Sequence, residues 1–439
     1  MNISRRRVTA GTLAASLLIS SVFLQAKEEV FESLPALGKE KTASNTRNGI
    51  YFDRSVTGLK WKSGASEIRI SSSLPAGVQQ ISGSDAGSPG DLLRRAQPVL
   101  DIRFERIYGF HIKPALGATS GILDAYLESN FMDSFRIRVG RFMPSFGRES
   151  LQPAAALAFN ERAFSTNQMP IREISGQIYG ELLGRTAEYH LGVFSGPAID
   201  SGGSRYSIPG YDNSTDFSGR LFARPFQDSG PNLTRGLGLG IAYDYQTQHS
   251  QTAPGNWGLT VFRSPGQKSF ASNSYDAYAG LGGERIFPRV YYHNGPFEVL
   301  GEYMLSRRGM DGAPATPKVG SDAFQVQFAW FVADGNKFLG RTMPGNPLDG
   351  ASAPTAGAVQ LLARYSELSI GQDAFTNGLM NINRSARNAK DFGVGLNWHL
   401  NRNTKLQLNY DQTSFEGGAP ASADRPSEKA LSSRMQFAF

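Results

Sequence analysis

Apolar and polar residues alternate with a period of two along most of this chain. The pattern runs from Phe324 to Val332 and recurs over 237–245, 394–400, 406–410 and 431–439. A period of two is typical of β-strands that present one apolar face, and a helix would need a period near 3.6. Outside the first 26 residues, helical periodicity is confined to short patches. The alternation therefore predicts an all-β fold.

Short turns and long connections follow one another between these predicted strands. Asn294-Gly295 and 401–403 are tight-turn signals. The long connections, rich in Gly, Ser, Pro and Asn, are 82–91, 196–214, 246–256, 307–321, 334–356 and 371–389. No interior stretch of 18 apolar residues is present and mean hydropathy is −0.31, which excludes a helical membrane protein. The arrangement predicts a transmembrane antiparallel β-barrel, with the short turns on the periplasmic side and the long connections together on the exterior side. A soluble β-sandwich or lectin-like fold is the alternative.

The two ends of the chain fit an exported barrel. Residues 1–26 begin with Arg5, Arg6 and Arg7 and continue into an apolar run, which predicts a signal peptide. Residues 27–47 read as a charged periplasmic lead-in and 48–439 as one barrel. Residues 431–439 end on Phe439, as expected for a closing strand that leaves no open edge in the membrane. The chain has no Cys, so no disulfide contributes to its stability.

Positive charge gathers between Arg94 and Arg172, where eleven Lys and Arg face seven Asp and Glu. If the apolar residues of 135–139 face lipid, Arg136 and Arg138 face the lumen, and the same parity turns Arg103 inward. A charge on the lipid face near the midplane would cost about 2–4 kcal/mol. Inward arginines favour an anion-selective pore. The alternative is that acids of the same region pair with these arginines and only brace the wall.

The segment 142–171 interrupts the alternation directly after a predicted strand. It contains the Ala-rich run 154–158 and two arginines, Arg148 and Arg162. A connection this long without strands of its own is usually functional or disordered. In a barrel it would fold into the lumen and narrow it, and the alternative is an ordinary exterior loop.

Several motifs carry a resemblance to a known family. They are LLRRAQPVLDIRF, LDAYLES, FRIRVGRFMPSFGRESLQ, FNERAF and GVGLNWHLNRNTKLQLNY, in this order along residues 90–439. Together they resemble the phosphate-selective porin O and P family. The resemblance implies a trimeric barrel of about 16 strands, an inward third loop and a cationic lumen for phosphate-like anions. It also implies a binding site built from Arg94, Arg95, Asp124 and Arg162.

The chain departs from the family pattern at four positions. Ser150 stands where phosphate-specific members have a lysine, Pro153 and Ala154 stand where they have serines, and Gly109 replaces a strand lysine. Each such loss removes a charge-assisted hydrogen bond of about 1.5–3 kcal/mol. We therefore expect an outer-membrane porin for passive diffusion of phosphate- or polyphosphate-like anions, with a general or organic-anion porin as the alternative.

The sequence contains few signals for other functions. The five histidines lack metal-ligand spacing, so no metal or cofactor is predicted. The formal net charge is +7, and without the three arginines of the predicted signal peptide it is 7 − 3 = +4, a mild charge that argues against a nucleic-acid partner. The expected partners are outer-membrane lipid and lipopolysaccharide, small anions, and two further copies in a homotrimer. Remote alternatives are an outer-membrane enzyme using His399 with Ser369, and an adhesin using loops such as 334–356.

Overall fold

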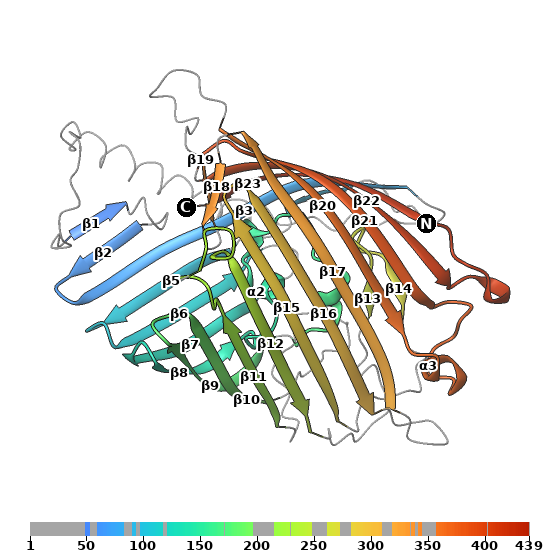
Figure 1. Cartoon of the computed structure of the whole chain (residues 1–439), viewed down its shortest axis with the longest axis horizontal. Coiled ribbons are helices and arrows are strands. Elements are labelled where there is room, and N and C mark those ends of the chain that lie inside the picture. The colour runs from blue at the N-terminus through green and yellow to red at the C-terminus, as the bar shows by residue number, and fades with distance from the viewer. Residues whose placement is uncertain are drawn as a thin grey trace, which may run out of the picture. The chain divides into compact units, whose positions relative to one another are not determined.

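The computed structural model describes most of the chain, and its compact unit comprises residues 48–439 (Figure 1). The described residues are 49–52, 59–82, 90–93, 97–116, 121–170, 172–195, 215–228, 230–247, 261–272, 282–309, 318–333, 335–338, 341–344, 357–401 and 403–438. The predicted signal peptide and lead-in lie outside them and stay predictions. No helix in these ranges is long and apolar enough to cross a membrane.

One antiparallel sheet of nineteen strands dominates the described residues. Its strands are β1 (Gly49–Phe52), β2 (Leu59–Ser63), β3 (Ser66–Ser82), β4 (Gly90–Leu93), β5 (Gln97–Phe104), β6 (Tyr108–Ala115), β7 (Gly121–Met132), β8 (Phe135–Phe142), β9 (Glu173–Leu182), β10 (Ala187–Phe194), β11 (Asp216–Ala223), β12 (Leu237–Gln246), β15 (Gly283–Asn294), β16 (Phe297–Gly309), β17 (Lys318–Ala333), β20 (Ala358–Ile370), β21 (Ala386–His399), β22 (Thr404–Gly417) and β23 (Glu428–Ala438). The all-β prediction is confirmed. The count exceeds the expected 16 because β1, β2 and β4 are short extra strands.

Smaller elements occupy the connections. Two separate hairpins are β13 (Phe262–Arg263) with β14 (Ser269–Ala271), and β18 (Gly335–Phe338) with β19 (Arg341–Pro344). The helical turns are α2 (Arg148–Leu151), α3 (Asp373–Thr376), η1 (Ala154–Ala156), η2 (Phe164–Gln168) and η3 (Pro420–Ser422). Each has five residues or fewer, so the sheet carries the fold.

The first and the last strands of a continuous series, β5 and β23, both pair with β3. From β5 to β23, each strand of the main sheet pairs with the next strand of that sheet along the chain. The long strand β3 pairs with β5 through residues 67–73 and with β23 through residues 73–82. We expect a closing strand to pair with the first strand; in the described residues β23 pairs with β3, and the short strand β1 pairs with β2.

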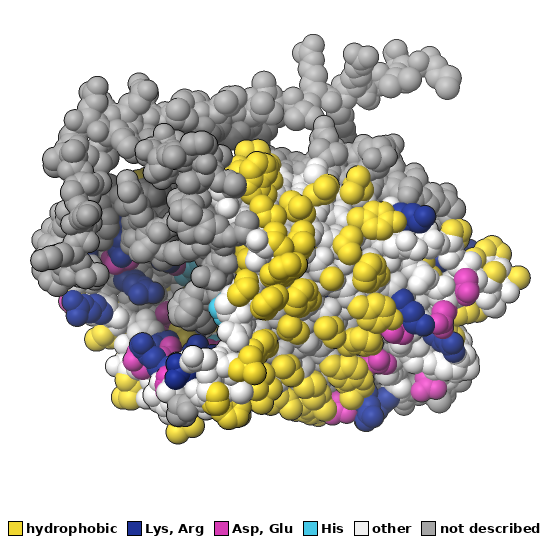
Figure 2. All heavy atoms as spheres, turned by 45° about the horizontal axis from the view of Figure 1, so that its top comes forward, with side chains coloured by type: hydrophobic (Ala, Val, Ile, Leu, Met, Phe, Trp, Pro, Cys, Tyr) yellow, Lys and Arg dark blue, Asp and Glu magenta, His cyan; other side chains and the backbone are white. Residues whose placement is uncertain are grey.

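The two faces of the sheet carry opposite kinds of side chain. On β17, Phe328 and Trp330 are 40% and 41% exposed, whereas Gln325 and Gln327 are 1% and 5% exposed. Figure 2 shows hydrophobic side chains over a broad area of the surface, with charged side chains towards its margins. A soluble sheet would bury the apolar face in a core and leave the amides in water. This inverted pattern is what a lipid-facing sheet requires.

The register assigns the connections to two edges of the sheet. The short turns 105–107, 133–134, 295–296 and 400–403 lie at one edge. The long connection between β17 and β20 belongs to this same edge, because Trp330 pairs with Phe297 and Ala358 pairs with His399. The expectation that 334–356 projects with the other long loops is therefore wrong: strand order, not loop length, fixes the edge.

Candidate functional site

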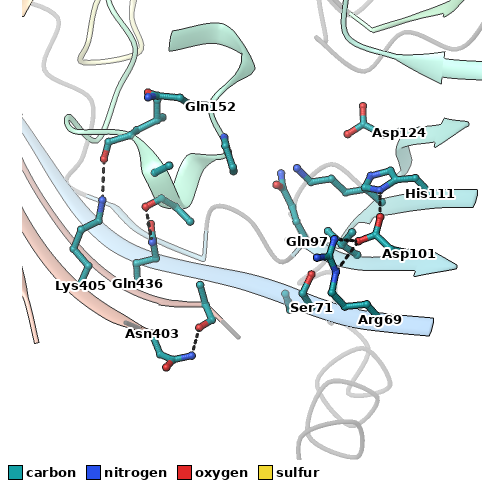
Figure 3. Close-up of a pocket in the computed structure, with 18 of the residues that line it drawn as sticks. Arg69, Ser71, Gln97, Asp101, His111, Asp124, Gln152, Asn403, Lys405 and Gln436 are labelled. Carbon is teal, nitrogen blue, oxygen red and sulfur yellow. Dashed lines mark hydrogen bonds and ion pairs between the residues drawn. The ribbon is translucent and has the colours of Figure 1, made fainter. Parts of the chain in front are cut away.

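The segment 143–172 leaves β8, covers part of the inner face of the sheet, and returns as β9. Side chains of β22 and β23 donate hydrogen bonds to its backbone carbonyls. Lys405 Nζ reaches Leu157 O at 2.8 Å, Gln407 Nε2 reaches Ala158 O at 2.8 Å, and Gln436 Nε2 reaches Ala155 O at 3.0 Å. Figure 3 shows Lys405 and Gln436 directed at this segment. We call residues 143–172 the inserted segment.

Two buried charged residues hold the inserted segment at two points, near residues 148–149 and near residues 159–161. The Arg364 side chain is fully buried; its Nη1 donates to Glu161 O at 2.7 Å and its Nη2 to Asp411 Oδ1 at 3.0 Å. Its guanidinium also lies 4.2 Å from the centre of the Phe159 ring. On β16, Glu302 Oε1 accepts the backbone N–H groups of residues 148 and 149 at 2.6 and 3.2 Å. The segment is therefore held by both backbone and side-chain contacts.

An apolar cluster closes the space between the inserted segment and the sheet. Phe146 and Phe164 of the segment are each 1% exposed. Phe146 packs 5.5 Å from the Phe287 ring, and Phe164 packs edge-on 5.5 Å from the Phe270 ring of β14. The hairpin β13–β14 is thus a second segment that packs against this side of the sheet. Burial of these large rings stabilises the covered half by the hydrophobic effect.

A cavity of about 830 Å³ lies on the other side of the inserted segment (Figure 3). It is bounded by the segment around η1 and by inner-face residues of β3, β5–β9 and β20–β23. Its charged lining residues among those described are Arg69, Arg103, Lys113, Arg136, Arg138 and Lys405, with Asp101, Asp124 and Glu128. Six cations against three carboxylates give the cavity a positive balance.

Each cavity carboxylate already has a cation. Arg69 Nη2 lies 2.6 Å from Asp101 Oδ2, and His111 Nδ1 lies 2.6 Å from Asp101 Oδ1. Arg138 pairs with Glu128 at 2.8 Å. Arg103, by contrast, is exposed and forms no ion pair or side-chain hydrogen bond with the described residues. It is the cavity arginine whose charge is most available to a solute.

Rings and one guanidinium stack across five neighbouring strands of the cavity wall. His111 stacks on Tyr126 at 4.6 Å, and Tyr179 stacks on His190 at 5.3 Å. The Arg138 guanidinium lies between the two tyrosines, 4.4 and 4.9 Å from their ring centres. Both faces of Arg138 are therefore occupied, and its Nη2 donates to Glu128 and to the hydroxyl of Tyr179. This arrangement braces the wall.

The predicted site residues fall in different places. Arg103, Arg136 and Arg138 line the cavity, as their parity predicts. Asp124 also lines it, and its carboxylate accepts Arg172 Nε at 2.7 Å. Arg94 and Arg95 lie outside the described residues, so their role stays a prediction.

Two predicted site residues of the inserted segment, Arg148 and Arg162, do not line the cavity. Arg162 is not among the cavity-lining residues, and its guanidinium donates to Glu149 O and Gln152 O within the segment. Arg148 lies over the Tyr291 ring at 3.8 Å.

The four departures from the family pattern can also be located. Gly109 and Pro153 line the cavity. Ser150 is buried, and its hydroxyl donates to Gly147 O at 2.9 Å. Ala154 is buried, and its carbonyl accepts Arg434 Nη2 at 3.3 Å. The hydroxyl of Ser150 is therefore engaged inside the inserted segment.

Sequence reasoning missed several cavity residues, namely Arg69, His111, Lys113, Tyr126, Tyr179 and Lys405. Most alternate with apolar residues on their strands, so the parity argument applied to Arg136 would have found them. Among the described residues, no group of three His, Cys, Asp or Glu could hold a metal ion.

Comparison with known proteins gives the family. The sequence pattern of the phosphate-selective porin O and P family matches residues 89–439, and the chain belongs to this family. No curated protein sequence matches the chain. Its place is the bacterial outer membrane, as for the channels whose structures it resembles.

Three solved structures show the same fold at low sequence identity. The outer membrane channel DcaP of Acinetobacter baumannii is 11% identical, with a TM-score of 0.55 and coverage of 90% of this chain and 100% of that one. OprB of Pseudomonas putida at high pH is 9% identical, with a TM-score of 0.52 and coverage of 85% and 94%. The trimer form of OmpT from Vibrio cholerae is 10% identical, with a TM-score of 0.50 and coverage of 86% and 100%.

Proposed function

We propose that this porin conducts small anions passively through the lumen beside the inserted segment. The observation that carries the proposal is the cavity of about 830 Å³ with six Lys and Arg against three Asp and Glu. Fixed cations in a confined space raise the local anion concentration and lower the barrier to anion entry. The function is that of a channel and needs no covalent chemistry.

The route follows the strands whose inner face remains open. The inserted segment covers the inner face around β16, β17 and β20–β23, so the solute passes along the wall of β3 and β5–β9. Arg103, which forms no ion pair with the described residues, offers the first contact. Lys113 and Arg136 extend the cationic wall, with Arg94 and Arg95 proposed as further members on the basis of the family resemblance.

The preferred solute is a phosphate-like oxyanion, on the strength of family membership. One observation favours a second candidate, a general anion porin. Ser150, Pro153 and Ala154 present no free hydroxyl or ammonium group where phosphate-specific members place them, and Ser150 donates within its own segment. Fewer charge-assisted hydrogen bonds weaken the distinction between phosphate and chloride.

The proposed assembly is a closed barrel of sixteen strands in a homotrimer. Closure is supported by the pairing of β23 with β3, since β3 also pairs with β5. The sixteen are β3, β5–β12, β15–β17 and β20–β23. A trimer is supported by family resemblance and by a similar fold that was solved in a trimer form. Cross-linking of the protein in detergent, followed by mass measurement, tests the trimer.

Single-channel recording across a KCl gradient tests the function. The reversal potential is expected to show chloride preference, and titrated phosphate is expected to reduce the chloride current. Arg103→Gln should lower the anion preference. Arg185→Gln should not, because Arg185 lies in an exposed turn with a side chain 65% exposed. Cation preference in the unmodified protein would overturn the proposal, and anion preference without block by phosphate would establish the general anion porin.

A further inference from the structure

One histidine of the cavity wall, His111 of β6, is held by a carboxylate on one side and a ring on the other. Its Nδ1 lies 2.6 Å from Oδ1 of Asp101, which stands opposite it in register on β5. Figure 3 shows the imidazole directed at this carboxylate. On β7, Tyr126 is the partner of His111 in register, and the two rings stack with their centres 4.6 Å apart and their planes at 15°. Neighbours on both sides therefore fix the orientation of the imidazole.

The second ring nitrogen of His111 is open to the cavity. Nε2 forms no hydrogen bond with a described residue, and it is not buried. The side chain is 18% exposed and borders the cavity of about 830 Å³. In a neutral ring with its proton on Nδ1, Nε2 is a hydrogen-bond acceptor, whereas in an imidazolium it is a donor. A proton on this atom therefore changes both the charge and the hydrogen-bonding character of the wall.

The carboxylate that holds His111 is already neutralised by an arginine. Arg69 of β3 is the partner of Asp101 in register, and its Nη2 lies 2.6 Å from Asp101 Oδ2. Beyond Tyr126, the guanidinium of Arg138 lies 4.4 Å from the tyrosine ring centre. Arginine keeps its charge at every pH at which the protein is folded. A proton on His111 therefore adds a charge that Asp101 does not cancel.

The remaining charged groups near His111 lie on its own strand and on β7. Lys113, two residues further along β6, pairs in register with Asp124. Asp124 and Glu128, the carboxylates of β7 that border the cavity, each have an arginine partner. The described lining contains no further carboxylate. Protonated His111 is therefore a seventh cation in the cavity, beside the six Lys and Arg.

We propose that His111 makes the anion preference of this pore depend on pH. In acid, the imidazolium donates through Nδ1 to Asp101 and presents Nε2–H and one extra charge to passing anions. In alkali, the neutral ring keeps its Nδ1–H bond to Asp101, so the wall keeps its shape and loses the charge. Histidine is the side chain whose charge ordinarily changes between about pH 5 and 8. The proposal rests on the proposed function, because it concerns the lumen through which the anions pass.

Two other histidines serve as controls. His190 stacks on Tyr179 with ring centres 5.3 Å apart, as His111 does on Tyr126, but it lies outside the lining of the cavity. His399 borders the cavity but is buried, and its ring centre lies 5.9 Å from that of Phe331.

Reversal potentials of the full-length protein in a planar bilayer test the proposal, recorded across a KCl gradient at several values between about pH 5 and 8. The unmodified pore should prefer chloride most strongly at the acid end. Carboxylates titrate mainly below this range, so they contribute little to the change. His111→Gln has no titratable ring and should show the alkaline preference at every pH. His190→Gln and His399→Gln should each keep the full change with pH.

His111→Lys covers the case in which His111→Gln fails to fold, because lysine retains a cation for Asp101. This variant should show the acid preference at every pH, so the two substitutions should give flat profiles at opposite levels. A chloride preference independent of pH in the unmodified protein would overturn the proposal. An unchanged pH profile in either variant of His111, or its loss in His399→Gln, would do the same. Cation preference at every pH would instead overturn the proposed function.

Discussion

The two halves of the inner face carry different kinds of side chain and face different surroundings. Around β5–β9 the inward side chains are mainly charged and aromatic, and they border an open cavity. Around β17 and β20–β23 the inward side chains are largely amides and hydroxyls, such as Gln325, Gln407 and Asn409, and they lie beneath the inserted segment. A neutral amide can bond a backbone carbonyl without burying a charge, whereas a guanidinium needs water or a counter-ion. The type of inward residue therefore reports what faces it.

Arg364 is a buried cation on the covered half, and its surroundings support this comparison. Its side chain is completely buried on the covered half, yet three carboxylates lie within 4.0 Å, those of Glu149, Asp391 and Asp411, and a ring covers one face. Arg138 on the open half needs a single carboxylate, Glu128, because its side chain is 21% exposed. The buried guanidinium of Arg364 thus has more carboxylates around it than the partly exposed guanidinium of Arg138.

The largest expected effect is on the covered half. Arg364→Leu would leave Asp391 and Asp411 buried without their cation, and breaking such a buried network costs about 3–5 kcal/mol. Chemical unfolding in detergent measures this loss. The control is Arg387→Leu, whose side chain is 48% exposed at the start of β21. Equal stability of the two variants would contradict the assigned role of Arg364.

Release of the inserted segment comes next. Glu302→Leu would remove the acceptor of two backbone N–H groups, at a cost of about 1–3 kcal/mol for each group left unsatisfied. With its first turn freed, the segment should narrow the lumen less. Single-channel conductance and current noise should therefore both rise. A variant with unchanged conductance would show that the other anchors hold the segment without Glu302.

Smaller effects are expected in the open half, and their signs should be opposite. Asp124→Asn frees Arg172 from its carboxylate and should increase anion preference. Arg103→Gln should decrease it. Each change alters the cavity by one charge, so the reversal potential should move by a similar amount in opposite directions. Movement in the same direction would show that these residues act through local structure.

The smallest effect is expected for Arg138→Lys. Lysine keeps the charge but cannot stack between Tyr126 and Tyr179, so stability should fall by about 0.5–2 kcal/mol, the range for cation–π contacts. The reversal potential should stay within error of the unmodified value. A large loss of anion preference would instead assign Arg138 to solute binding.

The sequence predicted those features that depend on neighbouring residues of one strand, and it did not predict contacts between residues distant in sequence. The parity of 135–139 predicted the inward position of Arg136 and Arg138 because a strand has no third option. The length of 142–171 likewise indicated an inserted segment. The partners of Asp124 and Arg162 were beyond reach, because Arg172 and the carbonyls of residues 149 and 152 approach them only after the segment has folded.

Two errors have the same origin. The connection 334–356 was assigned by its length, although the edge it occupies depends on the number of strands before it. Arg69 and Lys405 were missed because both lie outside the basic region 94–172 in sequence, yet strand pairing brings both to the cavity. The charge of a stretch of sequence therefore does not predict the charge of a cavity whose lining comes from strands that are distant in sequence.

Many of the hydrogen bonds that hold the inserted segment are made to its backbone. Carbonyls of residues 154, 155, 157, 158, 160 and 161 accept hydrogen bonds from side chains of the sheet. Every residue type has the same backbone carbonyl. The side chains at 155 and 156, which border the cavity, are therefore not needed for these hydrogen bonds. Substitutions at these two positions can therefore change which solutes the lumen admits while the hydrogen bonds that hold the segment are kept.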